Sequence, residues 1–292
     1  MNSISIITDS CCDLSLKNIE HNNINIISTP VSFGEESYRD RDTITLQQFY
    51  SRLAEGETPS TSQIPPEDYL SAFQKELEAG NKVIAICFSG ELSGIYESAL
   101  LAKKQIDSED IAVIDSRSAS LGLGLTVLKA AEAVENGCSW EEVIAEVEEN
   151  CRYMEHIFAV GKLEMLKRGG RISGGKALIG NILNVKPILH FEAGKIKPLS
   201  KVRGIDNMVD FLVEKLQERG NYNSTPEFIG ISHSNDRELA EKLQIRIEEK
   251  VGSPHNLDFG EIGAAVGSHV GSGTVALFFK GQEPVAEPEI VI

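Results

Sequence analysis

The chain has 292 residues, of which 41% are hydrophobic and 25% charged, and its formal net charge is −16. This is the composition of an ordinary globular protein, and the negative charge excludes a general nucleic-acid-binding surface. The start of the chain, MNSISIITDS, lacks the basic and apolar regions of a signal peptide, and no apolar run suits a membrane span. The five cysteines show no CxxC spacing. Reduced thiols in the cytoplasm are therefore expected, and the length is typical of about two domains.

Short apolar runs alternate with helical patterns in the first half of the chain. Strands are predicted at residues 3–7, 23–28, 83–87 and 111–114, and helices at 65–77, 94–106, 120–135 and 139–153, the last two as amphipathic helices. Alternating strands and helices favour an α/β domain with a parallel sheet covered on both faces.

The second half follows a different pattern. Two strands at 185–191 and 196–202 flank a glycine-containing turn and predict a hairpin. Further strands are predicted at 156–160, 228–232, 256–262 and 274–279, and helices at 207–218 and 237–249. These elements indicate an α+β domain with a mixed or antiparallel sheet. We expect domains at residues 1–157 and 158–292.

The segment 262–279, IGAAVGSHVGSGTVALFF, contains a single ionisable side chain, His269. We interpret it as two buried strands joined by a glycine-rich turn. A buried imidazole needs a hydrogen-bond partner. That partner is either a ligand or, as in many protein cores, the backbone.

Hydroxyl-rich loops follow three of the predicted strands, and a fourth polar cluster precedes a helix that starts with proline. These clusters span residues 8–13, 88–94, 115–118 and 58–63. Ligands of open α/β sheets bind at the carboxyl ends of the strands, so we expect the clusters to converge on a binding site. Ordinary helix capping by serine, threonine and aspartate is the alternative for each loop.

Ser93 and Gly94 open a predicted helix, where backbone N–H groups favour an anion and glycine permits close approach. Together with His269 they offer hydrogen bonds to a carboxylate without a strong charge. Such a site suits an acid whose affinity comes mainly from an apolar tail. The apolar segment 177–185, which includes Ile182, is expected either to line the pocket or to form a core helix.

Other chemistries fit the sequence less well. Ser93, His269 and Asp115 are the residue types of a nucleophilic triad, so a serine-type acyl hydrolase is the alternative function, although no G-x-S-x-G motif occurs. The glycine-rich segment 169–176 lacks the phosphate-loop pattern. No metal-binding motif is visible, and neither a metal nor a cofactor is expected.

Positive charge is concentrated in one segment. Residues 162–203 contain ten basic and two acidic side chains, a local charge of +8 on an acidic protein. This asymmetry favours a local anionic partner, for example a membrane surface. A solvated basic face without a partner is the alternative.

Eight motifs occur together in one order along the chain. They are ITDSCCDLS, TSQIPPEDY, SGELSGIYESA, VIDSRSASLGLG, LKRGGRIS, KPIL, KVRG and IGAAVGSHVGSG. In this order, the motifs resemble the DegV family of bacterial fatty-acid-binding proteins over nearly the whole chain. Departures from the family pattern include Cys11-Cys12, where serine or threonine is commoner, and Ile64 after the TSQ motif.

The resemblance implies a Rossmann-like α/β domain, a second α+β domain and a tunnel for a long-chain fatty acid between them. It implies that Thr61, Ser93 and His269 bind the carboxylate. From the loops and the apolar segment above, Ser62, Gly94 and Ile182 are additional candidates for the pocket. It further implies a cytoplasmic carrier without catalytic activity, whose bound acid is phosphorylated by a separate ATP-dependent kinase. Arg171, Lys201 and Arg203 are the implied partner contacts.

Overall fold

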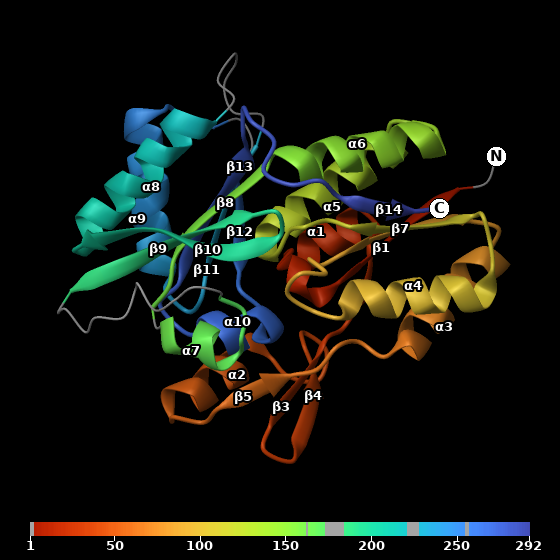
Figure 1. Cartoon of the computed structure of the whole chain (residues 1–292), viewed down its shortest axis with the longest axis horizontal. Helices are drawn as coiled ribbons and strands as arrows, with labels where there is room; N and C mark the ends of the chain where they lie inside the picture. The colour runs from red at the N-terminus through yellow and green to blue at the C-terminus, as the bar shows by residue number, and fades with distance from the viewer. Residues whose placement is uncertain (1–2, 162, 173–183, 221–227, 255–256) are drawn as a thin grey trace.

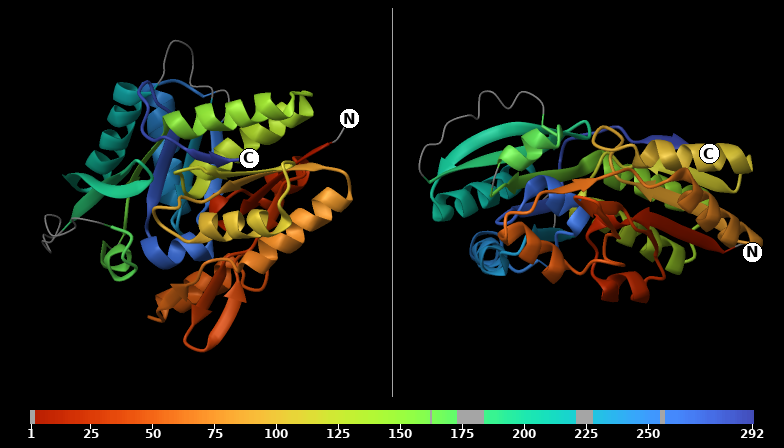
Figure 2. Two further views of the ribbon diagram at one scale, coloured as in Figure 1. Left: turned by 45° about the vertical axis from the view of Figure 1, so that its right-hand side comes forward. Right: turned by 90° about the horizontal axis from the view of Figure 1, so that it is seen from below.

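The computed structural model describes residues 3–161, 163–172, 184–220, 228–254 and 257–292, and within them the chain forms three β-sheets (Figure 1). Two larger sheets are neighbours, and a small sheet lies beneath them in this view. Figure 2 shows the same arrangement from two further directions.

The first sheet has the strand order β14-β7-β6-β1-β2. Its strands are β1 (Ile4–Asp9), β2 (Asn25–Ile27), β6 (Lys82–Cys87), β7 (Ile111–Asp115) and β14 (Glu289–Val291). All of its neighbours are parallel except β14, which pairs antiparallel with β7. The predicted parallel sheet is confirmed. Its edge strand β14 comes from the last residues of the chain, where no strand was predicted.

The second sheet has the order β10-β9-β8-β13-β11-β12. Its strands are β8 (Met154–Ala159), β9 (Val185–Glu192), β10 (Lys195–Arg203), β11 (Ile229–His233), β12 (Leu257–Glu261) and β13 (Val275–Lys280). Only the β11–β12 pair is parallel. The predicted mixed sheet and the β9–β10 hairpin are confirmed.

The third sheet, of order β4-β3-β5, was not predicted. It consists of β3 (Pro30–Phe33), β4 (Glu36–Arg39) and β5 (Pro59–Thr61), all antiparallel. Helix α2 (Leu46–Ala54) connects β4 to β5, and helix α10 (Ala264–Val270) contacts α2, β3 and β5. The small sheet therefore brings Thr61, at the end of β5, near a helix from the far end of the chain.

Helix α10 corrects a prediction. Residues 264–270 form a helix and not the first of two strands, although β13 confirms the second. The glycines that suggested a turn instead permit close packing: a Cβ on Gly267 would lie 2.8 Å from Cε1 of Phe49 in α2. Tertiary contact has overridden a poor local helix propensity.

The other helices lie close to the predicted positions where they were predicted. They are α1 (Leu16–His21), α3 (Pro66–Glu78), α4 (Ile95–Ile106), α5 (Ser120–Glu135), α6 (Trp140–Tyr153), α7 (Leu163–Arg168), α8 (Ile205–Arg219) and α9 (Arg237–Lys250), with a short 3-10 turn, η1 (Ser10–Cys12). In the parts of the chain that the structure describes, no helix combines the length and apolarity needed to cross a membrane.

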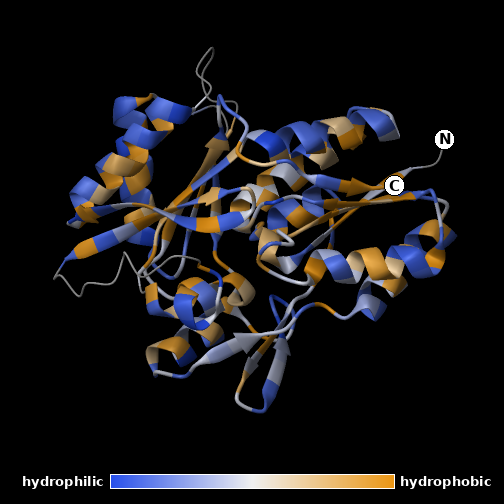
Figure 3. Cartoon of the chain, in the orientation of Figure 1, coloured by the Kyte–Doolittle hydropathy of each residue, from blue (hydrophilic) through white to orange (hydrophobic). Residues whose placement is uncertain are grey.

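Helix α5 joins the two larger sheets. Its first half, SLGLGLTV, is buried throughout, and it contacts β1 and β6 of the first sheet and β8, β11 and β13 of the second. This half is therefore a core segment and not amphipathic as predicted, while the second half keeps an exposed side that includes Glu132 and Glu135. By contrast, Figure 3 shows hydrophobic and hydrophilic residues alternating along α8 and α9, whose apolar sides form a separate core with β8, β11 and β13.

Candidate functional site

A cavity lies where the two larger sheets meet, and most of its wall is apolar. The lining residues are Cys11, Thr29, Thr61, Ser62, Phe88, Leu92, Ser93, Ile95, Ala119, Ser120, His156, Phe158, Leu166, Arg171, Phe191, Ile196, Ile262, Ala265, Val266, His269, Val270, Thr274, Ala276 and Phe278. An apolar cavity with a few polar side chains is the usual form of a small-molecule site.

Thr61 and His269 meet at this cavity. The Thr61 Oγ1 atom, at the end of β5, lies 2.8 Å from Nε2 of His269, in α10. The other ring nitrogen, Nδ1, is shielded from solvent and has no hydrogen-bond partner among the described residues. A Cβ on Gly169 would lie 2.3 Å from Nδ1, so the backbone after α7 fixes the ring from that side and only glycine fits there.

The environment of His269 keeps its imidazole neutral. Burial, and then the nearby charges of Arg171 and Arg168, lower the pKa of His269 from 6.5 to about 4. At neutral pH the ring therefore carries one proton, which it shares with Thr61 or holds at Nδ1. It contributes hydrogen bonding and not positive charge.

Ser93 and Ser62 also line the cavity, while Gly94 lies at the start of α4 and contacts a side chain of the protein. Ser93 is half-buried in the loop between β6 and α4, and Ser62 is exposed. Gly94 caps α4, and a Cβ there would lie 2.0 Å from Oε1 of Gln63. The close neighbour of Gly94 is thus the Gln63 side chain. Ile182 lies outside the described residues.

Arg171 lines the same cavity, which corrects the expectation of a site without a strong charge. Its Nε donates to the Leu92 carbonyl at 3.0 Å, and its Nη1 contacts the Gly169 carbonyl. The sequence placed Arg171 in a basic segment but could not show that this segment folds back to the β6–α4 loop. The other two basic candidates, Lys201 and Arg203, are exposed on β10.

A second histidine of the cavity wall, His156, was not identified from the sequence. Its Nε2 lies 2.6 Å from Oγ of Ser118 and accepts from the Ala119 N–H at 3.3 Å, and its Nδ1 lies 3.0 Å from the Met154 carbonyl. The ring stacks on Phe191 with a centroid distance of 4.3 Å. Burial lowers the pKa of His156 to about 4. Both nitrogens are satisfied within the protein.

The carboxylates of the hydroxyl-rich loops hold those loops together. Asp9 accepts from the N–H groups of Cys11 at 3.1 Å and Phe88 at 2.8 Å. Asp115 accepts from Gly90 and Arg117 N–H groups and pairs with the Arg117 side chain at 3.0 Å. The capping interpretation holds for Asp9, which caps η1, whereas Asp115 bridges two loops and caps no described helix. Within the described residues, Ser93, His269 and Asp115 form no hydrogen-bonded triad, because Thr61 is the partner of Nε2.

Among the described residues, no cluster of three or more histidine, cysteine, aspartate or glutamate side chains is placed to hold a metal ion. The five cysteines are free thiols, four of them buried. Burial raises the pKa of Cys12 to about 12, which makes this thiol unreactive.

Comparison with known proteins places the chain in a family. The model of the DegV family, described as one of uncharacterised proteins, matches residues 3–281. A DegV domain-containing protein of Clostridium perfringens is 36% identical over 96% of this chain and 99% of its own length. A solved structure described as fatty acid binding of a DegV family protein from Thermus thermophilus has 31% identity and a TM-score of 0.88, covering 96% of this chain and 99% of that one. Another, described as DegV, a fatty acid binding protein from Bacillus subtilis, has 32% identity and a TM-score of 0.81, covering 97% of this chain and 100% of that one. The chain belongs to the DegV family.

Proposed function

We propose that this protein binds a long-chain fatty acid in the cavity between the two larger sheets, with the carboxylate at Thr61, Ser93 and His269. The observation that carries the proposal is the Thr61–His269 pair, at 2.8 Å, on the wall of a largely apolar cavity. The related structures described as fatty-acid-binding proteins support it.

The chemistry of the wall fits such a ligand. When Nε2 of His269 carries the proton, it donates a hydrogen bond to the Thr61 hydroxyl oxygen. The threonine hydroxyl then donates its own hydrogen bond to a carboxylate oxygen of the ligand. Ser93 supplies a second hydroxyl and Arg171 a positive charge nearby. Phe88, Phe158, Phe278 and the aliphatic residues of the wall bury the acyl chain, at about 0.8 kcal/mol per methylene. Polar groups thus set the orientation of the ligand, and the apolar wall supplies most of the affinity.

The proposal extends to the role of the bound acid. The protein acts in the cytoplasm as a carrier without catalytic activity, and the two predicted domains, 1–157 and 158–292, enclose the ligand, although β14 at the end of the second domain completes the sheet of the first. A separate ATP-dependent kinase phosphorylates the carboxylate, and the exposed Lys201 and Arg203 contact that partner. Because Arg171 lines the cavity, a change at Arg171 would affect ligand binding as well as partner contact. Arg203→Glu, at an exposed position of β10, therefore tests partner contact separately from fatty-acid binding. It is expected to retain fatty-acid binding and to lower acyl-phosphate formation in a mixture with such a kinase and ATP.

The first experiment is mass spectrometry of an organic extract of the purified protein. About one fatty acid per chain, or stoichiometric uptake of an added fatty acid by the empty protein, supports the carrier function. An empty extract together with no uptake contradicts it. Ester substrates test the alternative: turnover that disappears in Ser93→Ala establishes an acyl hydrolase. No turnover, with weaker fatty-acid binding in that variant, supports a carrier.

A further inference from the structure

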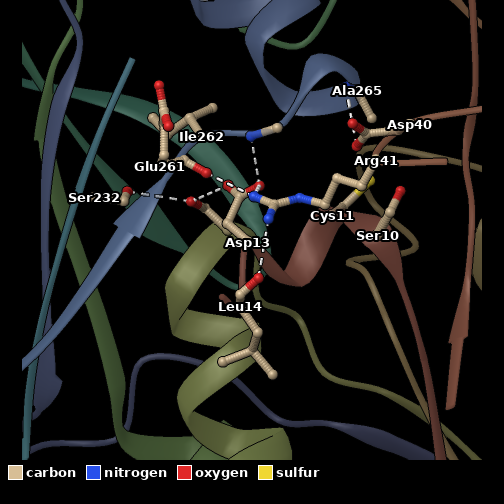
Figure 4. A network of polar contacts seen from close by, with 12 residues as sticks. Ser10, Cys11, Asp13, Leu14, Asp40, Arg41, Ser232, Glu261, Ile262 and Ala265 are labelled. Carbon is tan, nitrogen blue, oxygen red and sulfur yellow. Dashed lines mark hydrogen bonds and ion pairs between the residues drawn. The ribbon is translucent and has the colours of Figure 1, made fainter. Parts of the chain in front are cut away.

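The segment that carries His269 begins at a cluster of charged side chains formed by the buried Asp13 and Asp40 and the half-buried Arg41 (Figure 4). Asp40, which directly follows β4, accepts hydrogen bonds from two consecutive backbone N–H groups at the start of α10. The distances are 2.9 Å from Ala264 N to Oδ1 and 3.3 Å from Ala265 N to Oδ2. One side chain therefore satisfies two of the N–H groups that a helix leaves unpaired at its start.

Helix α10 depends on this external cap. Gly263, at the N-cap position, has no side chain to supply one. The helix has seven residues, and helices shorter than about 12 residues are marginal without tertiary support. A Cβ on Gly263 would lie 2.8 Å from Oδ2 of Asp40 and 3.0 Å from Oδ1 of Asp13. The chain thus enters α10 tightly enclosed by two carboxylates.

Asp13 and Arg41 hold the residues just before the helix. Asp13 Oδ1 accepts from the Gly263 N–H at 2.7 Å. The Arg41 guanidinium donates to the Glu261 carbonyl at 2.6 Å and pairs with Asp13 at 3.3 Å. The Tyr50 hydroxyl donates to the Ile262 carbonyl at 2.7 Å. Asp40 is the member of this cluster that contacts the helix itself.

The first turn of α10 sets the position of the imidazole. His269 follows Ala264 by five positions in the same helix, while its partner Thr61 belongs to β5. The 2.8 Å contact between Thr61 and His269 therefore joins two separate elements. Without the cap at Ala264 and Ala265, the first turn loosens, and the distance between the imidazole and the threonine hydroxyl is no longer fixed.

We propose that Asp40 is a positioning residue for ligand recognition, holding His269 against Thr61 through the first turn of α10. The inference rests on the proposed function, in which these two side chains bind a carboxylate. It adds that the preference for an acid over an uncharged lipid of the same chain length depends on the side chain of Asp40, which does not line the cavity.

The test compares affinities for palmitic acid and hexadecan-1-ol, which share a chain length but differ in the group at the polar end. In Asp40→Ala, affinity for the acid is expected to fall about 2- to 30-fold, the range for loss of a helix cap, while affinity for the alcohol stays close to that of the wild type. Asp40→Asn keeps one acceptor oxygen and is expected to restore most of the lost affinity, because asparagine caps helices about as well as aspartate.

A double-variant cycle shows whether Asp40 acts through His269. The pair Asp40→Ala/His269→Ala is expected to bind the acid no more weakly than His269→Ala alone. Glu155→Gln is the matched control: Glu155 is also a buried carboxylate, but it lies in β8 and pairs with Arg219 of α8. It is expected to leave the preference for acid over alcohol unchanged.

The outcomes separate this inference from the proposed function. Equal losses for acid and alcohol in Asp40→Ala, or additive losses in the double variant, overturn the positioning role while leaving the binding site intact. Unchanged affinity for the acid in His269→Ala overturns the assignment of the carboxylate site itself. If Asp40→Ala does not fold, Asp40→Asn provides the test. The imidazole NMR spectrum of this variant reports the Thr61–His269 hydrogen bond. An unchanged hydrogen bond together with a reduced preference for the acid contradicts the inference.

Discussion

Two histidines contribute to the wall of one cavity, and their surroundings differ in a way that separates structure from function. At His156 both ring nitrogens have partners within the protein, and the ring stacks on Phe191. At His269 one nitrogen contacts Thr61, and the other is shielded from solvent with no partner among the described residues. Burial lowers the pKa of both to about 4.

A low pKa therefore does not by itself identify a functional histidine. The pKa values of the two rings are the same because burial disfavours the imidazolium in both. What distinguishes them is hydrogen bonding: the fully satisfied imidazole of His156 stabilises the fold, while that of His269 pairs with Thr61, whose hydroxyl can donate onward to a ligand in the cavity. Substitutions at the two rings and around them test this distinction.

Replacing each histidine by alanine should give opposite results. His156→Ala removes three hydrogen bonds and a stacked ring from the core, and its free energy of unfolding should fall by about 3–5 kcal/mol. His269→Ala should change that free energy by less than about 1 kcal/mol but weaken fatty-acid binding by about 1–3 kcal/mol. Urea denaturation and ligand titration measure the two effects. Similar losses of unfolding free energy in both variants would contradict the distinction between a structural His156 and a ligand-binding His269.

Each imidazole packs against a glycine, so replacing that glycine by alanine displaces the ring while the histidine itself is kept. A Cβ on Gly122, in α5, would lie 2.4 Å from Nε2 of His156, and one on Gly169 would lie 2.3 Å from Nδ1 of His269. Gly122→Ala should lower the free energy of unfolding by about 1–3 kcal/mol through overpacking, despite the better helix propensity of alanine. Gly169→Ala should lower fatty-acid affinity more than stability. The reverse pattern in denaturation and titration would contradict the assigned roles.

The pH dependence of stability should reveal His156 as a buried neutral group. The unfolded chain takes up a proton near the ordinary pKa of 6.5, but the folded protein only near 4. The unfolded state therefore binds more protons between these values, and the free energy of unfolding falls as the pH drops through this interval. His156→Gln lacks this contribution and should lose less stability on acidification than the wild type.

Urea denaturation at about pH 7 and about pH 5 measures the effect. Asp9 and Asp13 act in the opposite direction, because burial raises the pKa of each to about 6 and the folded protein binds their protons more tightly. Both aspartates are present in the two proteins, so their contributions cancel in the comparison. Equal losses of stability in wild type and variant would mean that His156 is not buried as a neutral ring.

The smallest effect is expected at the exposed edge of the cavity. Ser62 lines the cavity but is exposed, whereas Ser93 is half-buried. Ser62→Ala should change fatty-acid affinity by less than about 0.5 kcal/mol, because water replaces the lost hydroxyl. Ser93→Ala should have a larger effect in the same titration. A loss in Ser62→Ala equal to that in Ser93→Ala would place the carboxylate nearer the surface than proposed.

Local patterns were sufficient for the regular parts of the fold. The buried runs of β1, β6 and β7, the β9–β10 hairpin and the proline-initiated α3 were all predicted, because apolar periodicity and turn chemistry act over a few residues. The resemblance to the DegV family also selected Thr61, Ser93 and His269. The structure brings these three residues to one cavity, and their role as carboxylate ligands stays a prediction.

Long-range contact decided the rest. Helix α10 forms in a glycine-rich segment because Asp40, about 220 residues earlier in the chain, caps it. Arg171 reaches the cavity through Leu92, and β14 joins a sheet begun at the other end of the chain. The sequence by itself determined which segments are buried and which carry polar groups. Only the tertiary structure decided which of two histidines keeps a nitrogen without a partner among the described residues, because that depends on contacts that no local pattern contains.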